Sequence, residues 1–268
     1  MKGDPGFRPV FPAWRDLLER ARAAGEEPLR VALEREDGFV SVFDAVAPAR
    51  DADPDATCRI VERVVKFLLW SRGGWRIHFQ GPAAVGRRLK ADYAATGARA
   101  FDAQTMGRVY ERPFEVALHS PATFPEAREA VRFAGGHLDG FRIGFDLGAS
   151  DYKVAAVVDG EPVWTEEIPW SPGEQADPEY HYRLIRDGLK KAAARLPRVD
   201  AIGGSTAGIV IGNQIRIASL FRSVPEAAFE ARVKGLFDRL AADWGVPFEV
   251  ANDGEVTALA GMLSIGEP

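Results

Sequence analysis

The chain has 268 residues, which is long enough for two ordinary domains with a hydrophobic core each. Its 34 Lys and Arg residues against 39 Asp and Glu give a formal net charge of -5, so it lacks the basic field that a nucleic-acid backbone requires, and no nucleic-acid partner is expected. Charge, Gly and Pro interrupt the N-terminal stretch and no later apolar run reaches membrane-spanning length, so the sequence predicts a soluble, cytoplasmic protein with no membrane partner.

The first 140 residues alternate helical and strand patterns and predict an N-terminal α/β accessory domain over residues 1–140. An amphipathic helix opens it, and two strands joined by a tight turn at Asp37 and Gly38 predict a hairpin. A longer helix follows between an acidic, Pro-containing start and a Gly-Gly stop. The expected helices span residues 12–24, 53–74 and 83–97, the expected strands 29–37, 38–47, 75–82 and 112–118, and a Pro- and Gly-rich connector 119–140.

The histidine and cysteine side chains form no recognisable metal-binding pattern. Cys58 is the only cysteine, which excludes an internal disulfide and a cysteine-based zinc site in this chain. The helical spacing of its neighbours predicts a buried structural thiol rather than a nucleophile. His78, His119, His137 and His181 are scattered without metal-ligand spacing, so no histidine-based metal site is predicted either.

Residues 141–268 predict a second α/β block that opens with strands. Three consecutive strand patterns separated by turns predict a β-meander. Strands and amphipathic helices then alternate, which predicts a sheet with helices packed on it. The expected strands span residues 141–147, 152–160, 161–170, 199–208 and a short run from 246 to Asn252 and Asp253, and the expected helices span 177–197, 224–245 and the residues that follow Asp253.

The stretch "FRIGFDLGASDYKVAAVVDG", residues 141–160, places Asp146 at the end of an apolar strand with a glycine close behind it. A glycine-containing turn between two strands exposes backbone N–H groups that phosphate oxygens can approach. A carboxylate repels phosphate but can hold Mg²⁺, usually through water, and the metal then bridges to the phosphates. The pattern therefore suggests a nucleotide site with Asp146 as metal anchor, although an ordinary turn has the same pattern.

Two further motifs extend this hypothesis. "AIGGSTAG", residues 201–208, is a second glycine-rich turn after a strand, and "VANDGEVTALAG", residues 250–261, places Asn252 and Asp253 between a strand and a helix. With these three motifs in order, residues 141–268 resemble the ROK family (repressor, open reading frame, kinase) of the actin-like ATPase and sugar kinase superfamily. The resemblance implies an actin-like (ribonuclease H-like) ATPase lobe with a β-meander and flanking helices.

The resemblance also implies a site for a sugar and a nucleotide. Asp253 matches the family's general base, which takes the proton from a sugar hydroxyl as that oxygen attacks the γ-phosphate of ATP. ATP and Mg²⁺ are the implied cofactors, and a sugar is the implied substrate. The other implied or candidate residues are Asn252 as a ligand to sugar hydroxyls, Asp146 as the acid near Mg²⁺, Gly148, Ala149 and Ser150 as the phosphate-facing turn, Lys153 as a lysine that reaches the phosphates, Ser205 and Thr206 as substrate contacts, and Phe221 and Arg222 as specificity residues.

Several of these assignments have a purely structural alternative. Asn252 or Asp253 could merely cap the helix that follows. Lys153 could be a solvated residue on an alternating strand, and Ser205 and Thr206 could be ordinary turn formers beside glycine. The sequence alone leaves these alternatives open.

The sequence also departs from the family pattern. Its first turn reads "ASD" where the family has Gly-Thr-Lys or a near equivalent, so Asp151 adds a negative charge that puts phosphate affinity in doubt. The loop after residue 208 lacks the common Val-Pro-Gly-Pro, which leaves the hexose open. The family's second lobe would lie after Pro268, so the chain is expected to be a C-terminally truncated kinase lobe that offers half of the ATP contacts and could be inactive alone.

Two functions from different classes follow from these residues. The leading one is an ATP-dependent, glucokinase-like sugar kinase of carbohydrate metabolism. The alternative is a noncatalytic sugar- or nucleotide-binding regulator on the same scaffold, although residues 1–140 show no obvious basic helix-turn-helix, which favours the kinase. Another actin-like ATPase, such as an acyl or phosphate-metabolite kinase, would share the nucleotide motif but would not require Asn252 and Asp253. Self-association into a homo-oligomer is left open.

Overall fold

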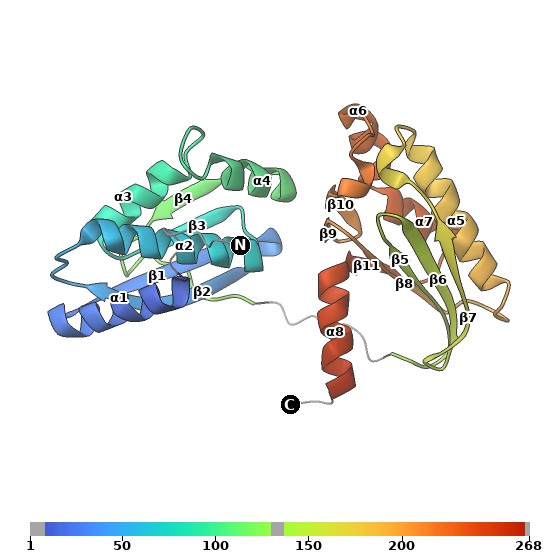
Figure 1. Ribbon diagram of the computed structural model, residues 1–268, viewed down its shortest axis with the longest axis horizontal. Helices are drawn as coiled ribbons and strands as arrows, with labels where there is room; N and C mark the ends of the chain where they lie inside the picture. The colour runs from blue at the N-terminus through green and yellow to red at the C-terminus, as the bar shows by residue number, and fades with distance from the viewer. Residues whose placement is uncertain (1–8, 130–136, 266–268) are drawn as a thin grey trace, which may run out of the picture. The chain divides into compact units, whose positions relative to one another are not determined.

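The computed structural model describes residues 9–129 and 137–265 and divides them into two compact units, 9–129 and 137–265 (Figure 1). Each unit combines a β-sheet with packed helices, so the predicted α/β class is confirmed. Among the described residues, no helix combines the length and the apolar composition that crossing a membrane would require.

The sheet of the first unit has four strands in the order β2-β1-β3-β4. β1 pairs antiparallel with both β2 and β3, whereas β3 and β4 run parallel. The predicted hairpin is confirmed, and its turn contains Asp37 at a φ of 55°. The strands are β1 Glu26–Glu34, β2 Val40–Pro48, β3 Arg76–Gln80 and β4 Glu115–Leu118.

Four helices accompany this sheet: α1 Val10–Ala24, α2 Pro54–Arg72, α3 Ala83–Asp92 and α4 Ala100–Tyr110. α2 begins where the Asp53 side chain accepts a hydrogen bond from the Ala56 N–H, with Pro54 in its first turn. Cys58 on α2 is 6% exposed, as predicted for a structural thiol, and burial raises its pKa. The helix expected over 83–97 ends at Asp92, and the sequence reading missed α4 entirely.

The sheet face opposite the main core of this unit is partly covered by the segment that follows β4. Phe124 packs there against Ala32 and Val40, and Arg128 forms an isolated antiparallel bridge with Val40. The part of the predicted connector that the structure describes before residue 130 therefore serves as a cover for the sheet. Residues 130–136 of that connector lie outside the described residues.

The second unit contains a five-stranded sheet in the order β11-β8-β5-β6-β7. β5, β6 and β7 form the predicted antiparallel meander, and β8 and β11 add to it in parallel with β5. The β-meander and the flanking helices that the resemblance implied are therefore present. The strands are β5 Phe141–Leu147, β6 Asp151–Val158, β7 Glu161–Pro169, β8 Ala201–Thr206 and β11 Phe248–Asn252.

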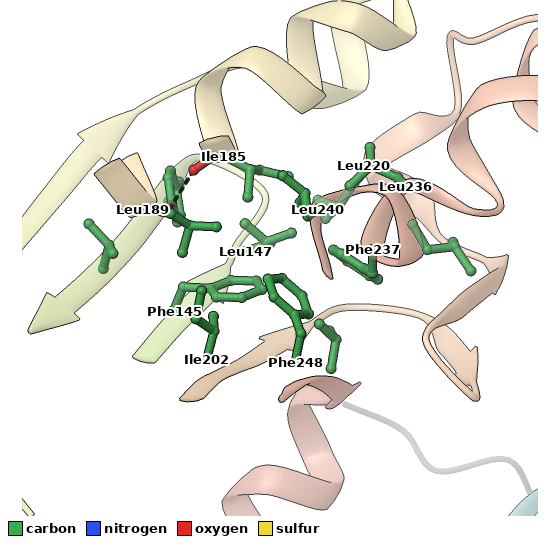
Figure 2. Close-up of a cluster of buried hydrophobic side chains, with 14 of the residues drawn as sticks. Phe145, Leu147, Ile185, Leu189, Ile202, Leu220, Leu236, Phe237, Leu240 and Phe248 are labelled. Carbon is green, nitrogen blue, oxygen red and sulfur yellow. Dashed lines mark hydrogen bonds between the residues drawn. The ribbon is translucent and has the colours of Figure 1, made fainter. Parts of the chain in front are cut away.

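Helices α5, Pro178–Ala193, and α7, Leu236–Trp244, cover one face of this sheet (Figure 1). Burial alternates along β5, so every second side chain faces these helices, as period-two geometry requires. Figure 2 shows the resulting core, in which Phe145 and Phe248 lie near Phe237 of α7. Beside this core, the buried Tyr152 hydroxyl donates a hydrogen bond of 3.1 Å to the Ile185 carbonyl of α5.

The single helix predicted over residues 224–245 is wrong. The chain instead forms a short turn of α-helix, α6 Glu226–Ala228, a π-type turn over Phe229–Val233, and then α7. Between the π-type turn and α7, the Lys234 carbonyl accepts a hydrogen bond from the Ile215 N–H at 2.9 Å, so this carbonyl is bonded to a separate strand instead of to the next turn of a helix. The amphipathic pattern continues across the break because both helical pieces face the same core.

A small hairpin that the sequence reading missed follows β8. β9, Ile209–Ile211, pairs antiparallel with β10, Gln214–Ile217, around a turn that contains Asn213 at a φ of 62°. The Asn213 amide donates to the Phe248 carbonyl at 2.7 Å and accepts from the Val250 N–H at 2.8 Å. One side chain thus satisfies two backbone groups of β11 as a neighbouring strand would.

Glycines distinguish the two faces of β8. A Cβ atom added at Gly204 would collide with the ring of Phe145, so the glycine lets that ring fill the core. A Cβ atom added at the preceding Gly203 would meet nothing within 4 Å, and the same holds at its partner Gly144 on β5. Within the described chain, the sheet face opposite α5 and α7 is therefore open over these two glycines.

Candidate functional site

The carboxyl ends of three parallel strands, β5, β8 and β11, meet at one edge of the second sheet. Their register pairs Asp146 with Ser205, and Thr206 with Asn252. Asp253 follows directly and begins helix α8, Asp253–Ile265. In open α/β sheets this edge is where ligands bind. The fold thus brings residues from all three sequence motifs to the same place.

Asp146 lies on the sheet face opposite the core and contacts the next strand. Its carboxylate accepts a hydrogen bond of 2.6 Å from the Ser205 hydroxyl, which is 8% exposed. The described residues contain no group of three or more His, Cys, Asp or Glu side chains that could hold a metal ion. A Mg²⁺ ion at Asp146 would therefore take most of its oxygen ligands from water and from bound phosphate, which is a common arrangement for this ion.

The turn over residues 148–150 is fixed from outside by Trp170 at the end of β7. The indole N–H of Trp170 donates to the Gly148 carbonyl at 2.9 Å, and its backbone N–H donates to the Ser150 carbonyl at 3.2 Å. Ala149 and Ser150 are exposed, and their backbone N–H groups donate to no acceptor in the described residues. The turn therefore combines a rigid frame with free donors, as a phosphate-binding turn requires. The sequence reading missed Trp170; its only signal was an aromatic residue at the end of the third meander strand.

Lys153 and Asp151 neutralise each other. The Lys153 ammonium lies 3.2 Å from the Asp151 carboxylate, and that hydrogen bond raises the pKa of Lys153. Asp151 also accepts from the Ser150 hydroxyl at 3.3 Å. The extra negative charge that departs from the family pattern is therefore balanced locally, and Lys153 contacts a carboxylate. In the register of the sheet, Lys153 lies opposite Asp146, and both line a shallow groove of about 370 Å³.

Asn252 has a structural role in this site, whereas the Asp253 side chain is exposed to solvent. The Asn252 amide donates to the Gly208 carbonyl at 2.6 Å, and its oxygen accepts from the Gly254 N–H at 2.8 Å. Asn252 therefore caps α8 and ties it to the turn after β8, as the structural alternative predicted. The Asp253 carboxylate is exposed, accepts only from the adjacent Gly254 N–H at 2.8 Å, and forms no ion pair with the described residues. It is the carboxylate at this edge that is free to accept a proton.

Two of the predicted substrate-contacting residues, Thr206 and Phe221, are buried. Thr206 is 0% exposed, because its side chain points from β8 into the packed interior. Phe221 is 2% exposed and packs on the rings of His181 and Phe229. Neither side chain can contact a substrate from these positions. Arg222, by contrast, is exposed and lines a hollow beside the turn over residues 148–150.

No protein-family model matches the chain, and no curated protein matches it either. Solved structures match about 46% of it. Lmo2764 from Listeria monocytogenes, a suggested N-acetylmannosamine kinase, is 22% identical at a TM-score of 0.36, and the match covers 46% of this chain and 38% of that one. The ROK hexokinase from Thermus thermophilus is 18% identical at a TM-score of 0.35, with 46% and 37% covered.

A ROK family transcriptional regulator, a homolog of the E. coli MLC protein, is 21% identical at a TM-score of 0.36, with 46% of this chain and 30% of that chain covered. The match with each of these three structures thus spans less than two thirds of that structure's length. Both kinases and a regulator are among the similar structures, and TM-scores of this size do not decide between them.

Proposed function

We propose that the second unit is the nucleotide- and sugar-binding lobe of an ATP-dependent sugar kinase, with Asp253 as general base. The observation that carries this proposal is the free Asp253 carboxylate at the edge where Asp146 and the turn over residues 148–150 also lie. A base needs an unpaired carboxylate beside the reacting hydroxyl, and phosphoryl transfer needs donors for the phosphate oxygens. The sequence resemblance to the ROK family supports the same assignment.

In the proposed reaction, Asp253 accepts the proton of a sugar hydroxyl. The hydroxyl oxygen forms a bond to the γ-phosphorus of ATP as the bond between that phosphorus and the bridging oxygen of ADP breaks. The free N–H groups of Ala149 and Ser150 would bind phosphate oxygens, and Mg²⁺ near Asp146 would neutralise their charge. Asn252 would act by holding the start of α8, and thereby Asp253, in place.

Asp253→Asn tests this proposal on the full-length polypeptide as its source organism makes it. Phosphate transfer from ATP to a panel of hexoses should fall by about 10²–10⁴-fold, the range that general-base catalysis contributes. Sugar binding should be retained, because the amide keeps the shape of the carboxylate.

Asp187→Asn is the matched control, since it removes an equal charge from the exposed surface of α5. That variant should transfer phosphate at the wild-type rate. Full turnover in Asp253→Asn would remove Asp253 as the base. A wild-type protein that binds a sugar or a nucleotide and transfers no phosphate would support the alternative, a noncatalytic regulator.

A further inference from the structure

A polar hollow of about 690 Å³ lies on the outer side of the turn over residues 148–150. No residue of the proposed reaction other than that turn borders it. Its lining includes side chains from three separate segments, which the fold brings together around one opening. The residues that matter here are Ala149, Ser150, Glu174, Gln175, Tyr180 and Arg222.

The Arg222 guanidinium lies close against the backbone of Gly173. A Cβ atom added at Gly173 would lie 2.7 Å from the guanidinium carbon of Arg222, so only glycine lets the guanidinium lie this close to the chain. The neighbouring Ser223 hydroxyl donates to the Gly173 carbonyl at 2.6 Å and fixes the two segments together. The local fold therefore places the backbone of Arg222 beside the hollow, within reach of its side chain.

The Arg222 guanidinium has no carboxylate partner within 4.0 Å among the described residues, whereas most exposed arginines of this unit do, such as Arg183, which pairs with Asp177. Glu174 is the only acidic side chain that borders the hollow, and it is exposed to solvent. Asp151 nearby is already paired with Lys153. The hollow thus presents an unpaired cation.

The turn over residues 148–150 supplies neutral donors to the same hollow. Ala149 and Ser150, whose N–H groups are free, both line it, and Trp170 fixes their turn through two hydrogen bonds. Tyr180 and Gln175 add a hydroxyl and an amide, and the Tyr180 hydroxyl accepts from the Ser171 N–H at 3.2 Å. A planar guanidinium and free N–H donors around one hollow match an oxyanion with several oxygens better than they match a neutral sugar.

We propose that Arg222 binds an anionic group, a phosphate or a carboxylate, in this hollow beside the turn over residues 148–150. The proposal deepens the proposed function. Anion binding by Arg222 does not depend on kinase activity, and only the source of the anion rests on the proposed function. One source is a phosphate of the nucleotide. Arg222 would then supply the positive charge that Lys153 cannot offer, because Lys153 is paired with Asp151. The other is an acidic substituent of the sugar substrate, which would make the substrate a sugar phosphate or a sugar acid.

Arg222→Gln tests the proposal on the full-length polypeptide, with inorganic tripolyphosphate and glucose 6-phosphate as separate probes in a calorimetric titration. A lost charge-assisted contact should weaken binding of the relevant probe by about 10-fold or more. Arg222→Lys should recover part of it, since an ammonium keeps the charge but loses the planar pair of donors. Gly173→Ala should weaken binding with the charge intact, because the new methyl group displaces the guanidinium.

Arg183→Gln is the matched control and should bind both probes as the wild type does. Weaker binding of tripolyphosphate assigns the anion to the nucleotide, and weaker binding of glucose 6-phosphate alone assigns it to the sugar. Wild-type affinity for both probes in Arg222→Gln would overturn the proposal, as would a wild-type protein that binds neither probe at millimolar concentration.

Failure of this inference differs from failure of the proposed function. If wild type and Arg222→Gln phosphorylate a sugar equally well and bind both probes equally, the kinase proposal stands and the anion site falls. If anion binding depends on Arg222 and no sugar is phosphorylated, the anion site stands and the kinase proposal falls.

Discussion

Trp170 joins the third strand of the meander to the turn over residues 148–150 through one side-chain and one backbone hydrogen bond. Replacement by Phe removes the indole donor together with part of the buried ring system. Because the Gly148 carbonyl then loses its partner and a small cavity forms, Trp170→Phe should lower the free energy of unfolding by about 1 kcal/mol for the hydrogen bond and by a further amount for the cavity. It should also weaken tripolyphosphate binding several-fold, since the turn loses its frame.

Urea unfolding and calorimetric titration of the same preparation measure both effects. Trp164→Phe provides the control, because Trp164 packs at the margin of the same core and touches no part of that turn. Unchanged tripolyphosphate affinity in Trp170→Phe would show that the turn needs no external support or binds no phosphate.

Single residues were the hardest scale to predict. The acid at Asp146 and the pair at 252 and 253 could be found because each interrupts an apolar strand at its end. The direction in which a side chain points could not be predicted from the sequence. The buried Thr206 and Phe221 were therefore predicted as substrate contacts. Burial of Thr206 at the end of β8, and of Phe221 in the segment after β10, depends on the chain segments that pack over them, which a local sequence pattern does not show.

The strand β8 separates a packed face from an open one at adjacent glycines. Gly204→Ala should lower the free energy of unfolding by about 1–3 kcal/mol, because the added methyl group forces the Phe145 ring out of its position in the core. Gly203→Ala is the matched control one residue away, and its methyl group meets open space, so its effect should stay within about 0.5 kcal/mol.

Urea unfolding of both variants tests this difference. Equal destabilisation would mean that a general loss of backbone freedom, rather than the collision with Phe145, determines the cost. A large effect of Gly203→Ala alone would mean that another part of the full-length protein covers the open face.

Elements with strong boundary signals could be predicted, and those without them could not. Helices α2 and α5 start at an acidic cap followed by proline, and both were found. Helix α4 has no side-chain cap and follows a Gly-containing turn, so nothing in the sequence marks its start. The break before α7 arises from a hydrogen bond to a distant strand, which no local pattern reveals.

Each unit buries one histidine, and both histidines contribute to the response of the molecule to mild acid. Burial lowers the pKa of His181 in the second unit and of His78 in the first below the ordinary value. Above pH 6.5 these histidines are neutral in both states. Below it the unfolded chain binds the protons more readily than the native one, so the free energy of unfolding should fall, by at most about 1.4 kcal/mol per pH unit for each histidine.

Urea unfolding at pH 7 and pH 5 measures this dependence. His181→Gln should flatten it, because the glutamine cannot titrate, whereas His137→Gln should not, because His137 is exposed. A pH dependence as steep in His181→Gln as in the wild type would contradict the role of His181.

The functional division of the molecule, an accessory domain before residue 141 and a kinase lobe after it, stays a prediction.

The Asn213 side chain has a consequence for how copies of this chain meet one another. An unpaired outer strand can template the addition of a strand from another molecule, which is a common route to aggregation. On β11, the Phe248 carbonyl and the Val250 N–H are already occupied by the Asn213 amide. An incoming strand would have to displace that amide first, so self-association of this unit through a continuous sheet at β11 is disfavoured.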